Sequence, residues 1–257
     1  MGIIPLTKNN YIEWDNFCLE SDDAWFWHTT NWLEYNLAYK PELKSISLSF
    51  MITEGPKILA ICPLLLETVN GEREFSFGGL SNWAPAFSNV LSSKRREKLI
   101  NMTFDHIDEL ALENNVARTS FALCPLCLPE NNYLMKQGYI DISLNSQIAD
   151  LSQDLKIIRS AMRKGHDYDI DRGLKELEVK IWDYENITKA IFDEYCELHH
   201  KDAGRITRPE ITWQMQLDWV RQGFAILLGA SPAIPILPVL SKPDQSIPIH
   251  TKFIGLS

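Results

Sequence analysis

The segment with the clearest capacity for chemistry is residues 152–177, the most basic part of a chain whose formal net charge is -9. Besides Lys156, it contains a basic cluster formed by Arg159, Arg163, Lys164, His166, Arg172 and Lys175. Guanidinium groups form paired hydrogen bonds to phosphate, and ammonium groups bind it as point charges. Arg163, Lys164 and His166 surround a helix-interrupting Gly165, and we expect these three residues to bind a phosphorylated or sugar-linked small molecule.

Acidic residues in the same segment favour another interpretation of its charge. Asp167, Asp169 and Asp171 are interleaved with the basic residues, and such a charge run is more often a solvated helix face. Both interpretations stay open at the level of sequence. The acidic balance of the whole chain disfavours non-specific binding to nucleic acid, so we expect no DNA partner.

A second basic pair, Arg205 and Arg208, lies in the sequence AGRITRPE before the last predicted helix. Two arginines on one loop suit a carboxylate or a phosphate, and they also suit a salt bridge between two parts of the protein. We place both among the expected substrate contacts. The sequence identifies neither a nucleophile nor a general base, so the catalytic residues stay unassigned.

The cysteines offer a candidate metal site. Cys124 and Cys127 form a CxxC, and Cys196 and His199 have CxxH spacing further along the chain, so these four residues could ligate zinc. The alternative is that the cysteines lie at the end of a predicted strand and within a predicted helix as packing residues. We favour the alternative and expect no metal, because the second pair is far from the single CxxC.

The first 150 residues predict a mixed α/β unit. Apolar periodicity and turn signals place strands at 3–6, 46–53, 57–66, 74–77 and 116–123, and helices at 11–20, from about 30, at 93–113 and at 131–137. Asn70-Gly71 predicts a hairpin turn. Pro63 predicts a bulge or an edge position within its strand.

The stretch 151–177 predicts a helical connector, after which the opening order of elements restarts. A strand is expected at 178–182, a helix at 187–200, a helix from Pro209 to Arg221 and a strand at 224–228. This repeat predicts a partial second lobe over 178–229. The remaining residues, 230–257, contain five prolines without a helical period and predict an irregular tail. Three of these prolines interrupt the uncharged run 223–241, so we expect no membrane span.

Short motifs are spread through both halves: WDNF at 14–17, WFWHTTNWLEY at 25–35, ICPLLLE at 61–67, the run 149–179, and HHKDAGRITRPEITW at 199–213. They resemble GNAT-like proteins related to the Fem-type, peptidoglycan bridge-forming aminoacyltransferases. The predicted order of elements also matches the GNAT fold. The resemblance implies tandem GNAT-like mixed sheets, with the first lobe complete and the second incomplete.

The resemblance implies acyl or aminoacyl transfer to an amine of a cell-envelope or polysaccharide precursor. It implies phosphate contacts for Arg163, Lys164 and His166. The long helical insertion of tRNA-dependent members is not visible, so we expect acyl-CoA rather than aminoacyl-tRNA as the donor. The family's spaced-glycine pattern for acyl-CoA is not found at residues 78–83, and we interpret this loop as structural.

The incomplete second lobe leads to further expectations. We expect a truncated chain with little or no activity, and an unpaired sheet edge that favours a homodimer. The rival interpretation is a non-catalytic protein that binds an anionic sugar nucleotide or a partner. No basic region followed by a long apolar run opens the sequence, so we expect a cytoplasmic location.

Overall fold

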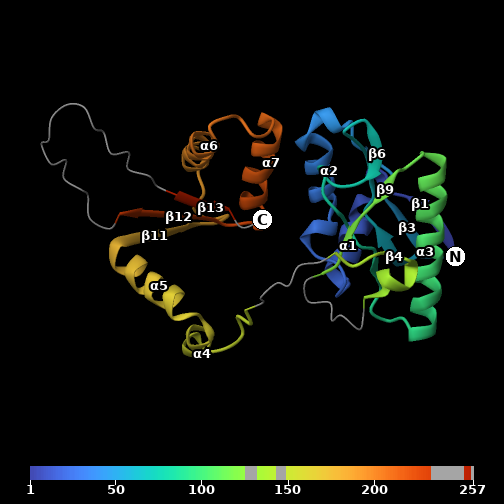
Figure 1. The fold of residues 1–257 in the computed structure, drawn as a ribbon, viewed down its shortest axis with the longest axis horizontal. Coiled ribbons are helices and arrows are strands. Elements are labelled where there is room, and N and C mark those ends of the chain that lie inside the picture. Colours follow the sequence, from blue (N-terminus) through green and yellow to red (C-terminus); the bar gives the residue numbers. More distant parts are fainter. Residues whose placement is uncertain (125–131, 143–148, 233–251, 256–257) are drawn as a thin grey trace, which may run out of the picture. The chain divides into compact units, whose positions relative to one another are not determined.

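The computed structural model describes residues 1–124, 132–142 and 149–232, together with the backbone of 252–255. The chain divides into two compact units, Met1–Ser146 and Gln147–Ser257, and each is described by itself (Figure 1). Both units combine helices with β-sheet, which confirms the predicted mixed α/β class. The predicted divisions after residues 150, 177 and 229 stay predictions. No helix in the described part of the chain has the length and apolar character that crossing a bilayer requires.

Unit 1 is built on two four-stranded sheets, with the orders β1-β3-β4-β8 and β2-β5-β6-β9. Their strands are β1 (Gly2–Pro5), β2 (Ile46–Ser47), β3 (Phe50–Glu54), β4 (Lys57–Cys62), β5 (Leu65–Val69), β6 (Glu72–Phe75), β8 (Ala86–Phe87) and β9 (Arg118–Thr119). A short parallel pair joins β7 (Asn82–Trp83) to β10 (Phe121–Ala122).

Two predicted strands are each divided between the two large sheets. The stretch 46–53 forms β2 and β3, and 57–66 forms β4 and β5, which corrects the prediction of continuous strands. Pro63 lies at the second break and has no backbone N–H for a ladder. The Ser49 hydroxyl bridges the breaks, because it accepts from Leu64 N at 3.0 Å and donates to Leu64 O at 3.3 Å.

The turn between β5 and β6 is the predicted hairpin. Asn70 and Gly71 have φ angles of 52° and 90°, and a two-residue type I′ turn requires positive φ at both positions. Val69 consequently pairs with Glu72. The third strand therefore begins at Glu72, two residues before the predicted start.

Three helices of unit 1 cover its sheets: α1 (Tyr11–Glu20), α2 (Thr30–Tyr39) and α3 (Ser93–Glu113). The first sheet is buried on both faces, since Met51 and Ile61 pack with α1 while Phe50 and Ile52 pack with α3. The Ser92 hydroxyl caps α3 at its predicted start. A 3₁₀ turn, η5 (Tyr133–Gln137), replaces the predicted short helix at 131–137.

Unit 2 contains an antiparallel sheet with the order β11-β12-β13. Its elements are α4 (Leu155–Ala161), α5 (Lys164–Glu176), β11 (Leu177–Trp182), α6 (Lys189–Ala203), α7 (Glu210–Arg221), β12 (Leu227–Pro232) and β13 (Lys252–Gly255). Phe192 of α6 packs with Trp213 and Leu217 of α7 in the core of this unit. The helix–helix pair was predicted, and Pro209 is the N-cap of α7 rather than its first residue.

Two boundaries in unit 2 differ from the prediction. The connector breaks before Arg163, which adopts an extended N-cap conformation, and Gly165 lies inside the first turn of α5. A glycine in the first turn destabilises a helix less than a glycine in the helix interior, where helix propensities apply fully. The predicted irregular tail contains the end of β12 and the strand β13, while residues 233–251 and 256–257 lie outside the described residues.

Candidate functional site

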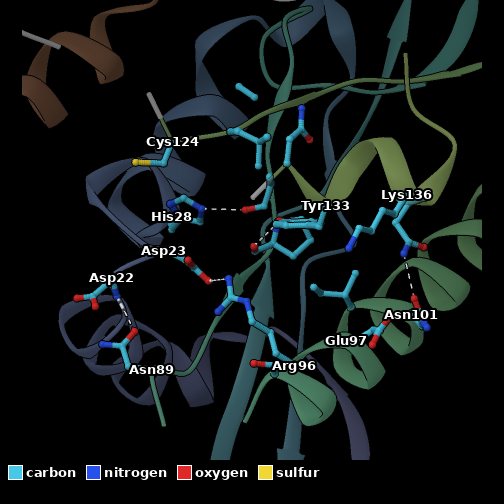
Figure 2. Close-up of a pocket in the computed structure, with 18 residues that line it drawn as sticks. Asp22, Asp23, His28, Asn89, Arg96, Glu97, Asn101, Cys124, Tyr133 and Lys136 are labelled. Atoms are coloured by element: carbon cyan, nitrogen blue, oxygen red, sulfur yellow. Dashed lines mark hydrogen bonds and ion pairs between the residues drawn. The ribbon is translucent and has the colours of Figure 1, made fainter. Parts of the chain in front are cut away.

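A hollow of about 950 Å³ opens in unit 1 beside the N-terminal half of α3. Five separate segments line it: the segment after α1, the region of β7 and β8, α3 itself, residues 122–124 at the end of β10, and η5 (Figure 2). The polar side chains that define its chemistry are Asp22, Asp23, His28, Arg96, Glu97 and Lys136. None of these residues was predicted from the sequence, because their common wall exists only after the five segments fold together.

His28 forms part of the buried wall of this hollow. Its Nε2–H donates to Ala84 O at 3.0 Å, and its Nδ1 accepts from Trp25 N at 3.3 Å. Burial lowers the pKa of His28 to about 4, so the ring is neutral at pH 7. With both ring nitrogens occupied by backbone groups, His28 fixes the wall and does not serve as a general base.

Asp23 and Arg96 form an ion pair across the hollow's rim, with 2.6 Å between Oδ2 and Nη2 (Figure 2). The same carboxylate oxygen accepts from Phe87 N at 3.0 Å. The guanidinium of Arg96 also lies 5.0 Å from the centre of the Phe87 ring. Together these contacts connect the loop after α1 to α3 and to β8.

Other charged groups of the hollow are uncommitted. Among the described residues, the side chains of Asp22, Glu97 and Lys136 have no hydrogen bond or ion pair. The amides of Asn101 and Gln137 bond to each other at 3.0 Å. A hollow with fixed walls and uncommitted acidic and basic groups suits a polar ligand that carries both an amine and hydroxyl or amide groups.

The glycine-rich turn after β6 is closed by a carboxylate of the protein itself. Gly78 N and Gly79 N donate to the two oxygens of Glu67 at 2.9 and 2.8 Å. The hydroxyls of Ser45 and Ser76 donate to the same carboxylate at 2.8 and 2.6 Å. Glu67 is 1% exposed, so these amides face an internal anion, in agreement with the structural interpretation of this loop.

The predicted phosphate contacts lie at the start of α5. Arg163 is its N-cap residue, Lys164 and His166 follow in the first turn, and all three are exposed. Within the described residues their side chains form no hydrogen bond or ion pair. Two of the three interleaved acids, Asp167 and Asp171, are bound by Arg159 of α4 at 2.7 Å, whereas Asp169 is exposed. Arg163, Lys164 and His166 therefore remain available to a ligand, and their phosphate contacts stay a prediction.

The other predicted pair, Arg205 and Arg208, occupies the loop between α6 and α7, and its members differ. Arg205 is exposed. The Arg208 guanidinium stacks over the Trp213 ring at 4.4 Å from its centre. His199, whose Nε2 lies 2.8 Å from Thr207 Oγ1, packs on the same indole. Burial lowers the pKa of His199, and Arg208 and His200 lower it further.

The cysteines do not form a cluster in the described part of the chain. Cys124 is half-buried at the edge of the hollow, and Cys127 lies outside the described residues. Burial, aided by Asp193 and Glu210, raises the pKa of Cys196 to about 12. No group of three or more His, Cys, Asp or Glu side chains among the described residues is arranged to hold a metal ion.

Comparison with known proteins identifies a structural relative. No family model and no curated protein sequence matches the chain. The crystal structure of FemX matches with a TM-score of 0.52 and 14% sequence identity, over 90% of this chain and 58% of that chain. The protein thus spans less than two thirds of the length of FemX. At this identity the likeness concerns the fold alone, and the GNAT-like detail stays a prediction. The chain therefore has a mixed α/β fold of the Fem type.

Proposed function

We propose that the protein is a Fem-type transferase that joins an acyl or aminoacyl group to an amine of a cell-envelope or polysaccharide precursor. The observation that carries this proposal is the fold likeness to FemX, which covers 90% of the chain. The polar hollow of unit 1 supports it by offering a place for the amine-bearing acceptor.

The proposed reaction needs little covalent chemistry from the protein. The amine nitrogen attacks the carbonyl carbon of the donor, a C–N bond forms, the C–S or C–O bond to the carrier breaks, and the amine proton passes to the leaving group. An alkylammonium must first lose a proton, and a positioned carboxylate assists that loss. Glu97 and Asp22 are the uncommitted carboxylates of the hollow. Positioning supplies most of the remaining acceleration.

A separate part of the proposal concerns unit 2 taken by itself. Arg163, Lys164 and His166 present three donors at one exposed helix start and would contact phosphate groups, with Arg205 and Arg208 as a second pair of contacts. Acyl-CoA is the proposed donor. Within the described residues, the longest helix is the 21-residue α3, and it packs in the core rather than extending as an arm for tRNA.

The test is direct transfer. The purified protein is incubated with radiolabelled acetyl-CoA, or with aminoacyl-tRNA, and a nucleotide-linked sugar that carries a primary amine. We expect a new amide whose mass exceeds that of the acceptor by the acyl group. Glu97→Gln should lower kcat at least about tenfold, while Lys98→Gln on the same helix, outside the hollow, should leave it unchanged.

Two outcomes would contradict the proposal. Absence of amide with either donor would refute transfer. Tight binding of the nucleotide sugar without transfer would instead identify a non-catalytic binding protein.

A further inference from the structure

Strand β11 is an open edge of the sheet in unit 2 (Figure 1). Among the described strands only β12 pairs with it, over the full length from Leu177 to Trp182. Leu177, Val179 and Ile181 alternate onto one face and are 40%, 57% and 55% exposed. The strand contains no proline and no bulge, two of the features that prevent an edge from pairing with another chain, and its two charged residues, Glu178 and Lys180, have opposite signs.

The residues opposite these three in β12 make the open face wider. Leu177, Val179 and Ile181 pair with Pro232, Ala230 and Leu228, and paired residues share a face of the sheet. All six side chains are apolar, and none of them is buried. A strand that adds to this edge would place its own side chains beside these on the same face, where cross-strand apolar pairs stabilise a sheet.

The sequence of β11 is complementary to itself when it is reversed. An antiparallel copy centred on Val179 sets Val179 against Val179, Leu177 against Ile181 and Glu178 against Lys180. Opposite charges directly across an antiparallel pair are stabilising, and like charges are destabilising. Centring the copy on Glu178 or on Lys180 instead places like charges face to face, so the charge pattern selects one register.

From this complementarity we propose that two copies of the chain join through β11. The two strands run antiparallel about a two-fold axis at Val179, and the sheets continue into one another as β13-β12-β11-β11-β12-β13. Lys180 lies 3.6 Å from Glu178 of its own strand, and in the dimer each would gain the opposite group of the partner. Such an isologous contact closes on itself and stops at two chains.

The dimer is expected to be weak and reversible. A six-residue edge contact is smaller than a standard interface, so we expect a dissociation constant of about 1 µM or weaker. The inference does not depend on the proposed transfer reaction, and a failure of either leaves the other standing.

Sedimentation equilibrium of the full chain over a range of concentrations tests the inference. The weight-average mass should rise from 29.6 kDa toward twice that value. Lys180→Glu sets the new carboxylate of one copy against Glu178 of the other, and should raise the dissociation constant at least about tenfold. Lys201→Glu makes the same charge change at an exposed position of α6 and should have no effect on association.

Charge exchange gives the decisive comparison. The double variant Glu178→Lys/Lys180→Glu restores opposite charges across the axis and should restore dimerisation. Glu178→Lys alone should be monomeric, and an equimolar mixture of Glu178→Lys with Lys180→Glu should form a heterodimer. Far-UV circular dichroism checks that each variant is folded.

The inference would be overturned by a wild-type chain that stays monomeric up to about 100 µM. That result would show that another part of the chain covers β11 or that β11 binds a different protein. A dimer that tolerates Lys180→Glu as well as Lys201→Glu would equally refute pairing through β11.

Discussion

The glycine turn of unit 1 and the basic turn of unit 2 both present groups that attract anions, and they use them differently. At Gly78-Gly79 the two amides are satisfied by the buried carboxylate of Glu67. At Arg163-Lys164-Gly165-His166 the exposed side chains form no ion pair within the described residues, and Arg159 holds two of the three nearby aspartates. An anion-attracting turn is therefore a candidate binding site only where the protein itself does not supply the anion.

The comparison predicts that unit 1 depends on its internal anion for stability. Glu67→Ala leaves two buried amides and two hydroxyls without their acceptor, and should lower the free energy of unfolding by about 4 kcal/mol. Urea denaturation followed by tryptophan fluorescence measures the loss. Glu67→Gln, which keeps one carbonyl acceptor, should lose less. A loss below about 1 kcal/mol for the alanine variant would mean that water replaces the carboxylate and that the turn is not closed.

The buried imidazole of unit 1 should make stability depend on pH. The pKa of His28 falls from 6.5 to about 4 on folding, so protons bind the unfolded chain first as the pH drops. Stability due to this residue is full above pH 6.5 and is lost between pH 6.5 and 4, by about 3 kcal/mol in total.

The free energy of unfolding, measured across this pH range for wild type and for His28→Gln, tests that expectation. Glutamine keeps a donor for Ala84 O and cannot titrate, so the variant should lose less stability on acidification than the wild type. His166→Gln, at an exposed position of unit 2, is the matched control. Parallel pH profiles for the wild type and His28→Gln would contradict the assignment.

The ion pair between Asp23 and Arg96 should contribute less to the free energy of unfolding than Glu67 or His28 does. Asp23 and Arg96 are about one third exposed, so solvent screens their attraction and Arg96→Gln should lower the free energy of unfolding by at most about 1 kcal/mol. The loss should shrink further in concentrated salt. A salt-independent loss would assign the effect to the contact between Arg96 and the Phe87 ring rather than to charge.

Substitutions in the basic turn of unit 2 should affect ligand binding much more than the stability of the fold. The double variant Arg163→Gln/Lys164→Gln should change the free energy of unfolding by less than about 0.5 kcal/mol. It should weaken binding of a nucleoside diphosphate sugar about tenfold or more in isothermal titration calorimetry. Lys175→Gln, at the other end of α5, should leave this affinity unchanged. Equal affinity of the double variant and the wild type would remove the turn from the substrate contacts.

Local signals in the sequence predicted the local parts of the fold. Asn70-Gly71 predicted the hairpin turn, with the next strand starting two residues earlier than expected, and the apolar period at 93–113 predicted α3. The division of two strands between the sheets was not predicted, because it depends on the bond between Ser49 and Leu64, two residues that are distant in sequence.

The candidate site was harder to predict, because it also depends on contacts between residues that are distant in sequence. Basic residues clustered in sequence, such as Arg163 and Lys164, were identified from their spacing. The walls of the hollow come from segments around residues 23, 85, 97, 123 and 134, which no short-range pattern connects. Glu67 carried one signal, an acidic residue at the end of the apolar run ICPLLLE, but its role depends on where the glycine turn folds.

The N-cap conformation at the start of α5 makes position 163 a useful place to attach a fluorescent probe. Arg163 serves as the N-cap through its backbone conformation, with no hydrogen bond from its side chain to the helix. The side chain can therefore be exchanged without losing that cap. In a chain that also carries Cys124→Ser and Cys127→Ser, Arg163→Cys would place a reactive thiol there, whereas burial raises the pKa of the Cys18, Cys62 and Cys196 thiols and makes them unreactive. A fluorophore at this position would report directly on any ligand that reaches the basic turn.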